Sequence, residues 1–120
     1  MPELNLGTGE AKFADIIWEK EPISASALVK ESEKELKWKK TTSYTVLKRL
    51  CEKGIFQNIN GIVSSIISKK DFCSMKSEKF VDETFGGSLP AFVAAFTSRK
   101  SLSAKEIKEL RELIDSYGEE

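Results

Sequence analysis

Hydrophobic residues in the first third of the chain recur every three or four positions, which is typical of one face of an amphipathic helix. The inward positions are Phe13, Ile16, Ile17, Ala27 and Leu28. The first predicted helix covers about residues 7–20 and ends before Pro22, because proline cannot continue the hydrogen-bond ladder. Ser24 is a candidate N-cap for a second helix that extends to about residue 34.

The stretch from Trp38 to Gly54 predicts a third helix with two chemically different faces. Its apolar face carries Val46, Leu47, Leu50 and Cys51. Its polar face carries Thr41, Tyr44, Thr45 and Lys48, at positions i, i+3, i+4 and i+7. We expect this helix to begin at a Thr41/Thr42 cap and to end at Gly54, with Trp38 packed beside the core rather than on DNA. Hydroxyls, an aromatic ring and cations on one exposed face suit the DNA major groove.

The period then changes from helical to extended. Residues 55–59 and 62–67 are short β-prone runs, and Asn60-Gly61 between them is a strong signal for a hairpin turn. Three helices followed by a hairpin is the order of a winged helix-turn-helix. We therefore predict a winged-helix DNA-binding domain over residues 1–68.

The remainder, residues 69–120, returns to helical spacing. Ser68 is a candidate cap for a helix to Phe85, in which Phe72, Phe80, Val81 and Thr84 are possible buried positions. Gly86-Gly87 ends that helix, Pro90 suits the first turn of the next, and Ser103 with Glu106 forms a capping box for the last. The predicted fold class is mainly α with a small β-hairpin.

These C-terminal helices carry more apolar surface than they can bury among themselves. We expect a helical C-terminal dimerisation domain in which a second copy covers that surface; the alternative is a tail folded back on the first domain. The residues expected at the dimer interface are Phe92, Phe96, Ile107, Leu110 and Ile114.

Charge is balanced overall, with 19 basic and 19 acidic side chains, but its distribution is uneven. Residues 34–53 hold seven Lys or Arg against two Glu, whereas residues 101–120 hold three against six. Lys39, Lys40 and Arg49 are candidate contacts to DNA phosphates. The alternatives are ordinary solvated helix faces, a salt bridge for Arg49 and a purely capping role for Thr42.

Catalytic and metal chemistry find little support in the sequence. There is no histidine, Cys51 and Cys73 lack metal-ligand spacing, and no Gly-rich phosphate loop is present. We expect a protein that is not an enzyme and needs no cofactor or metal. The absence of a signal-peptide pattern and of long apolar runs predicts a soluble, cytoplasmic protein without a membrane partner.

Four segments together resemble the penicillinase-repressor (BlaI/MecI/CopY) family of bacterial transcriptional regulators, over about residues 6–117. They are Ile16-Ile17-Trp18, residues 38–54 with their Thr-Thr start and Leu-Lys-Arg-Leu ending, Phe85-Gly86-Gly87-Ser88-Leu89, and residues 102–114. The resemblance implies a winged-helix domain, a helical dimerisation domain, and repression by a homodimer that occupies a palindromic operator in double-stranded DNA.

The resemblance also indicates where this chain departs from its branches. One branch is inactivated by proteolysis at an Asn–Phe bond, and the equivalent here is Ala95–Phe96. The copper-responsive branch carries Cys-x-Cys motifs, which this chain lacks. Family wings are often basic or aromatic, whereas residues 57–62 contain no Lys or Arg. The sequence does not identify a regulatory protease or an effector. The alternative function is a winged-helix adaptor that binds protein or responds to a ligand and does not read DNA sequence.

Overall fold

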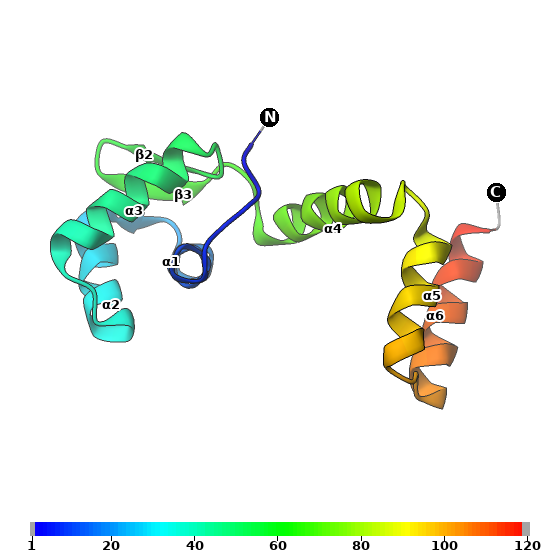
Figure 1. Cartoon of the computed structure of the whole chain (residues 1–120). Helices are drawn as coiled ribbons and strands as arrows, with labels where there is room; N and C mark the ends of the chain where they lie inside the picture. The colour runs from blue at the N-terminus through cyan, green and yellow to red at the C-terminus, as the bar shows by residue number, and fades with distance from the viewer. Residues whose placement is uncertain (1, 119–120) are drawn as a thin grey trace. The chain divides into compact units, whose positions relative to one another are not determined.

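The computed structural model describes residues 2–118, which divide into two compact units between Ser77 and Glu78. The elements in chain order are α1 (Thr8–Lys20), β1 (Ile23–Ser24), α2 (Ala25–Leu36), α3 (Lys40–Glu52), β2 (Phe56–Ile59), β3 (Ile62–Ser65), α4 (Lys69–Phe85), α5 (Leu89–Arg99) and α6 (Ala104–Tyr117) (Figure 1). The helix α4 begins in the first unit and ends in the second. The sequence placed the boundary at the start of α4, whereas the compact N-terminal unit also includes its first half, because Phe72 is buried there.

The N-terminal unit packs α1, α2 and α3 with a three-stranded antiparallel sheet in the order β1-β3-β2. Its core contains the predicted inward residues Phe13, Ile16, Ile17 and Leu28, while Ala27 is half-buried. Trp38 packs against this core, as predicted, and its ring stacks on Phe13 at 5.4 Å between centroids. The winged-helix order of elements is therefore confirmed.

The predicted hairpin is present, and the sheet has one strand more than the sequence indicated. Asn60 and Gly61 have φ of 53° and 83°, as a tight two-residue hairpin turn requires. The additional strand β1 pairs Ile23 with Val63 and Ser24 with Ile62. Two residues are too few for an alternating pattern to be read, so this pairing is visible only in three dimensions.

Helix caps confirm most predicted boundaries and correct one. Ser24 accepts a hydrogen bond from the Ala27 amide and so caps α2. The prediction that α3 starts at a Thr41/Thr42 cap is wrong: the N-cap is Lys39, and no side chain caps this end. The C-cap of α3 is Lys53, and Gly54 follows with a left-handed φ of 80°.

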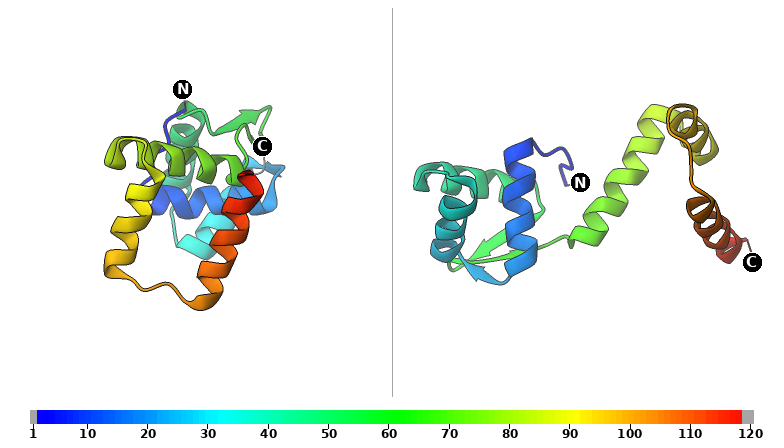
Figure 2. Two further views of the ribbon diagram at one scale, coloured as in Figure 1. Left: turned by 90° about the vertical axis from the view of Figure 1, so that its right-hand side faces the viewer. Right: turned by 90° about the horizontal axis from the view of Figure 1, so that it is seen from below.

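The C-terminal unit consists of the end of α4 followed by α5 and α6, which form an antiparallel helical hairpin (Figures 1 and 2). Ser88 caps α5 with Pro90 in its first turn, and Ser103 and Glu106 form the predicted capping box on α6. Phe80, Phe85 and Phe92 form an aromatic cluster with centroids 5.6–6.0 Å apart. Phe80 and Thr84 were possible buried positions, but both are exposed within the single chain. Among residues 2–118, no helix is both long and apolar enough to cross a membrane.

Candidate nucleic-acid interface

The two faces of α3 differ as the sequence predicted. Ser43, Val46, Leu47 and Leu50 are buried against the rest of the unit. The eight residues predicted to contact DNA are all exposed: Lys39, Lys40, Thr41, Thr42, Tyr44, Thr45, Lys48 and Arg49. Packing on one face therefore holds the helix, and its opposite face offers cations, hydroxyls and one phenol to a partner.

The hydroxyl of Thr45 already has one hydrogen-bond partner. Its Oγ1 donates to the Thr41 carbonyl at 2.9 Å, one helical turn earlier. The donor is thus used within the helix, and Thr45 presents an acceptor oxygen and a methyl group outward. Tyr44, which is 40% exposed, presents both its ring and its phenolic hydroxyl.

Four cations at this surface lack an ion-pair partner in the described part of the chain. Within residues 2–118, Lys39, Lys40, Lys48 and Arg49 make no ion pair. The alternative of a salt bridge for Arg49 is therefore absent from the described chain. These charges remain available to an anionic partner.

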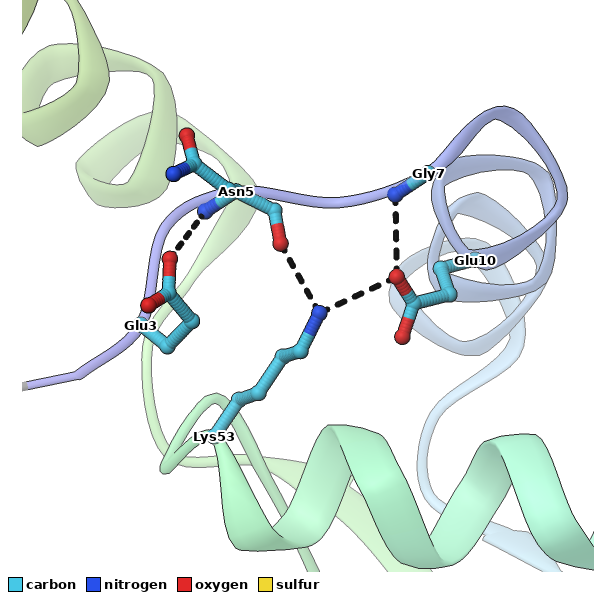
Figure 3. A network of polar contacts seen from close by, with 5 residues as sticks. All are labelled: Glu3, Asn5, Gly7, Glu10 and Lys53. Atoms are coloured by element: carbon cyan, nitrogen blue, oxygen red, sulfur yellow. Dashed lines mark hydrogen bonds and ion pairs between the residues drawn. The ribbon is translucent and has the colours of Figure 1, made fainter.

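Lys53 is the exception among the basic residues of this region, because it belongs to an internal network (Figure 3). Its ammonium group lies 3.0 Å from the carboxylate of Glu10 and donates to the Asn5 carbonyl at 2.8 Å. The backbone amide of Gly7 and then Lys53 lower the pKa of Glu10, because both stabilise the carboxylate. Lys53 thus ties the end of α3 to the N-terminal segment and the first turn of α1.

A buried polar contact joins α2 to α3. The hydroxyls of Ser32 and Ser43 are fully buried and hydrogen-bonded to each other. Ser32 also donates to the Val29 carbonyl at 2.9 Å, and Ser43 lies 3.4 Å from the Lys39 carbonyl. Neither serine was predicted from the sequence to take part in this contact. In the sequence each is only a serine at an inward position of a helix. Without knowledge of its hydrogen-bond partner, such a serine looks the same as any small residue that the core tolerates.

The wing, defined here as residues 54–68, carries no charged side chain. Ile59 and Ile62 flank its turn as a directly paired couple and are 57% and 46% exposed. Any contact that this wing makes to a nucleic acid is therefore made by uncharged groups.

The residues predicted at a dimer interface line the α5–α6 hairpin of the C-terminal unit. Phe96, Ile107, Leu110 and Ile114 are exposed in the single chain, and Phe92 is half-buried. Phe92, Phe96 and Leu110 also line an apolar groove of about 400 Å³ between α5 and α6. Exposed apolar surface of this extent on a small helical unit indicates a site where another surface packs.

The two cysteines, Cys51 and Cys73, are free thiols. Cys51 is half-buried beside the core, and burial raises the pKa of its thiol; Cys73 is exposed. Across the described residues, no group of Cys, Asp or Glu side chains is arranged to hold a metal ion.

Comparison with known proteins agrees with this geometry. A family model described as penicillinase repressor matches residues 6–116. The chain belongs to the penicillinase repressor family. A penicillinase repressor from Staphylococcus aureus is 31% identical over 119 residues, covering 94% of this chain and 93% of the relative. The methicillin resistance regulatory protein MecI of Staphylococcus aureus (strain Mu50 / ATCC 700699) is 28% identical over 114 residues, with coverage of 92% and 93%. The penicillinase repressor of Bacillus licheniformis is 26% identical over 116 residues, with coverage of 93% and 91%.

A solved structure extends the likeness to the fold. The solution structure of the DNA-binding domain of the repressor BlaI matches with a TM-score of 0.53 and 25% identity, covering 59% of this chain and 93% of that one. The relatives in this family are named as repressors and regulatory proteins, so the prediction that the chain is not an enzyme is confirmed.

Proposed function

We propose that this protein is a transcriptional repressor that binds a palindromic operator in double-stranded DNA as a homodimer, with α3 as the recognition helix. The observation that carries the proposal is the exposed face of α3 with its N-cap. It offers hydroxyls, a phenol and four cations that make no ion pair within residues 2–118, on a helix fixed by its buried face. Membership of the penicillinase repressor family and the likeness to the BlaI DNA-binding domain support the same reading.

The side chains of α3 divide into two roles. The residues that read base edges are Thr41, Tyr44, Thr45 and Lys48. The Thr45 hydroxyl oxygen can accept a hydrogen bond from a base, and its methyl group can contact a thymine methyl. Lys39, Lys40 and Arg49 contact phosphates and fix the helix in the groove without reading sequence. Thr42 lies between the two groups and does not cap α3, whose N-cap is Lys39.

We assign DNA binding to residues 1–68 and dimerisation to residues 69–120, whose proposed interface side chains all lie in the C-terminal unit. Burial of a large apolar side chain is worth about 1.5–3 kcal/mol. Phe96, Ile107, Leu110 and Ile114 together therefore provide several kcal/mol if a second copy covers them. A two-fold dimer then places two copies of α3 about one helical turn of DNA apart, or a multiple of it, over the two halves of a palindrome.

The test is selection of bound duplexes from a random DNA pool with the full chain, followed by titration of the selected duplex at several salt concentrations. We expect an inverted repeat whose binding weakens with salt. Tyr44→Phe and Lys48→Ala should weaken binding with the fold intact by circular dichroism, whereas Lys12→Ala, which removes an exposed cation from α1, is the matched control.

Failure to enrich any sequence would contradict the proposal. In that case the uncharged wing, with its exposed Ile59 and Ile62, favours the second candidate, a winged-helix module that binds protein. Equal loss of binding in the Lys12→Ala control would also contradict it, because the contact would then depend on total charge rather than on α3.

A further inference from the structure

Lys37, in the turn between α2 and α3, has an unusual backbone conformation. Its φ is 62°, in the left-handed region that favours glycine. Among residues 2–118, Asn60 is the other non-glycine residue with a positive φ, and asparagine tolerates this region. Lysine is not among the residues enriched in this region, but Lys37 is the C-cap of α2, a position where helices commonly take a left-handed residue.

The neighbours of Lys37 fix this conformation. Leu36 and Trp38, on either side of it, both pack against the core, and Trp38 stacks on Phe13. The buried hydrogen bond between Ser32 and Ser43 holds the two flanking helices together. The turn is therefore over-determined, and residue 37 is directed to solvent, where it is exposed.

The charge of Lys37 has no partner within residues 2–118. It lies two residues before Lys39 and three before Lys40, which are proposed phosphate contacts at the start of α3. A lysine at the end of α2 also complements the helix dipole, which accounts for a cation here without any ligand. The two explanations differ in what they predict for DNA.

We propose that Lys37 is an additional phosphate contact, presented beside α3 by a rigid left-handed turn. The inference rests on the proposed function and adds a residue to its DNA-binding surface. Because the turn is held by packing on both sides, the side chain of Lys37 starts from a fixed backbone position, and binding does not have to order the backbone of this part of the chain. A dipole role alone would leave DNA binding unchanged.

The experiment measures operator affinity against salt concentration, together with thermal unfolding, for Lys37→Gly, Lys37→Asn and Lys37→Arg in the full chain. Loss of one phosphate contact lowers the salt slope by about 0.9 and the affinity by about eightfold at about 0.1 M salt, so the dimer, which loses the contact twice, should lose about 1.8 in slope and about sixtyfold in affinity. We expect both effects for Lys37→Gly and Lys37→Asn, with an unfolding temperature that is unchanged or higher, since glycine and asparagine suit a positive φ. Lys37→Arg should keep the slope.

The controls separate the possible failures. Lys30→Gln removes another exposed cation of α2 and should leave the slope unchanged. If Lys37→Gly and Lys37→Asn bind with the wild-type slope while Lys48→Ala weakens binding, the role of Lys37 is overturned and the proposed function stands. If the wild-type chain binds no DNA with sequence preference, the proposed function fails and this inference fails with it. A lower affinity with an unchanged slope would show that Lys37 supports the turn rather than contacting phosphate, which also overturns the proposal.

Discussion

The buried serine pair between α2 and α3 allows a quantitative test of how the recognition helix is held. In Ser43→Ala, the Ser32 hydroxyl keeps its 2.9 Å hydrogen bond to the Val29 carbonyl and loses only a donor. In Ser32→Ala, the Ser43 hydroxyl is left buried with a 3.4 Å contact to the Lys39 carbonyl, which is a poor hydrogen bond. The two substitutions are therefore chemically similar but structurally unequal.

The magnitudes follow from this inequality. Losing the hydrogen bond costs about 1 kcal/mol, and a buried hydroxyl without a good partner costs about 1–3 kcal/mol. Alanine returns about 0.5 kcal/mol in helix propensity at each site. We expect the free energy of unfolding to fall by about 0.5 kcal/mol for Ser43→Ala, from the lost hydrogen bond, and by about 0.5–2.5 kcal/mol for Ser32→Ala, from the buried hydroxyl without a good partner. The double variant should be nearly as stable as the wild type, about 1–3 kcal/mol better than the sum of the two single losses, because no unpaired hydroxyl remains.

Urea unfolding of the full chain, followed by tryptophan fluorescence, measures these differences. Both tryptophans of the chain, Trp18 and Trp38, lie in the N-terminal unit, so the signal reports that unit alone. A loss of 1 kcal/mol moves the midpoint by about 0.5 M urea. Strict additivity of the two substitutions, or a larger loss for Ser43→Ala than for Ser32→Ala, would refute this account of the contact.

Four further substitutions test other parts of the molecule. Gly9→Ala should lower the thermal unfolding temperature despite alanine's better helix propensity, because its Cβ would lie 3.0 Å from the ring of Trp38; an unchanged or raised value would mean that the ring yields freely. Glu10→Gln should remove the stabilisation that comes from the lowered pKa of Glu10. This part of the free energy of unfolding is present above the ordinary pKa of 4.5 and is lost as the pH falls through the lower folded-state pKa. Urea titrations whose pH dependence coincides with that of the wild type would contradict this. Leu110→Glu should give monomers by sedimentation velocity, and an unchanged mass would remove Leu110 from the dimer interface. Ile59→Lys should add one phosphate contact to each uncharged wing and so raise the affinity of the dimer for its operator about sixtyfold at about 0.1 M salt, and a salt slope equal to that of the wild type would place the wing away from DNA.

Much of the N-terminal fold could be predicted from the sequence because its signals are local. The stripe of Phe13, Ile16 and Ile17 identifies α1, and the Asn60-Gly61 pair identifies the hairpin turn. The two faces of α3 could be predicted for the same reason. Once one face of a helix is known to be buried, the residues on the opposite face must be exposed.

The features that the sequence did not reveal depend on partners far along the chain. Ile23 forms a strand only because Val63 lies beside it, and Ser32 is satisfied only because Ser43 faces it. Lys53 belongs to the same basic stretch as Lys48, yet a partner 43 residues away, Glu10, takes up its charge. Charge counts along a sequence therefore overestimate the cations that are free for a ligand.

The position of charge in the N-terminal unit makes the salt dependence of DNA binding a measure of assembly. The wing has no charge, and Lys53 is paired, so six basic residues of the stretch 34–53 remain unpaired within the described chain: Lys34, Lys37, Lys39, Lys40, Lys48 and Arg49. Each of these that contacts phosphate adds about 0.9 to the salt slope, and a dimer on a palindrome uses every contact twice. A monomer made by Leu110→Glu should therefore bind a half-site with about half of the wild-type slope. A loss of affinity without that halving would mean that the second subunit stabilises the first rather than contacting DNA itself.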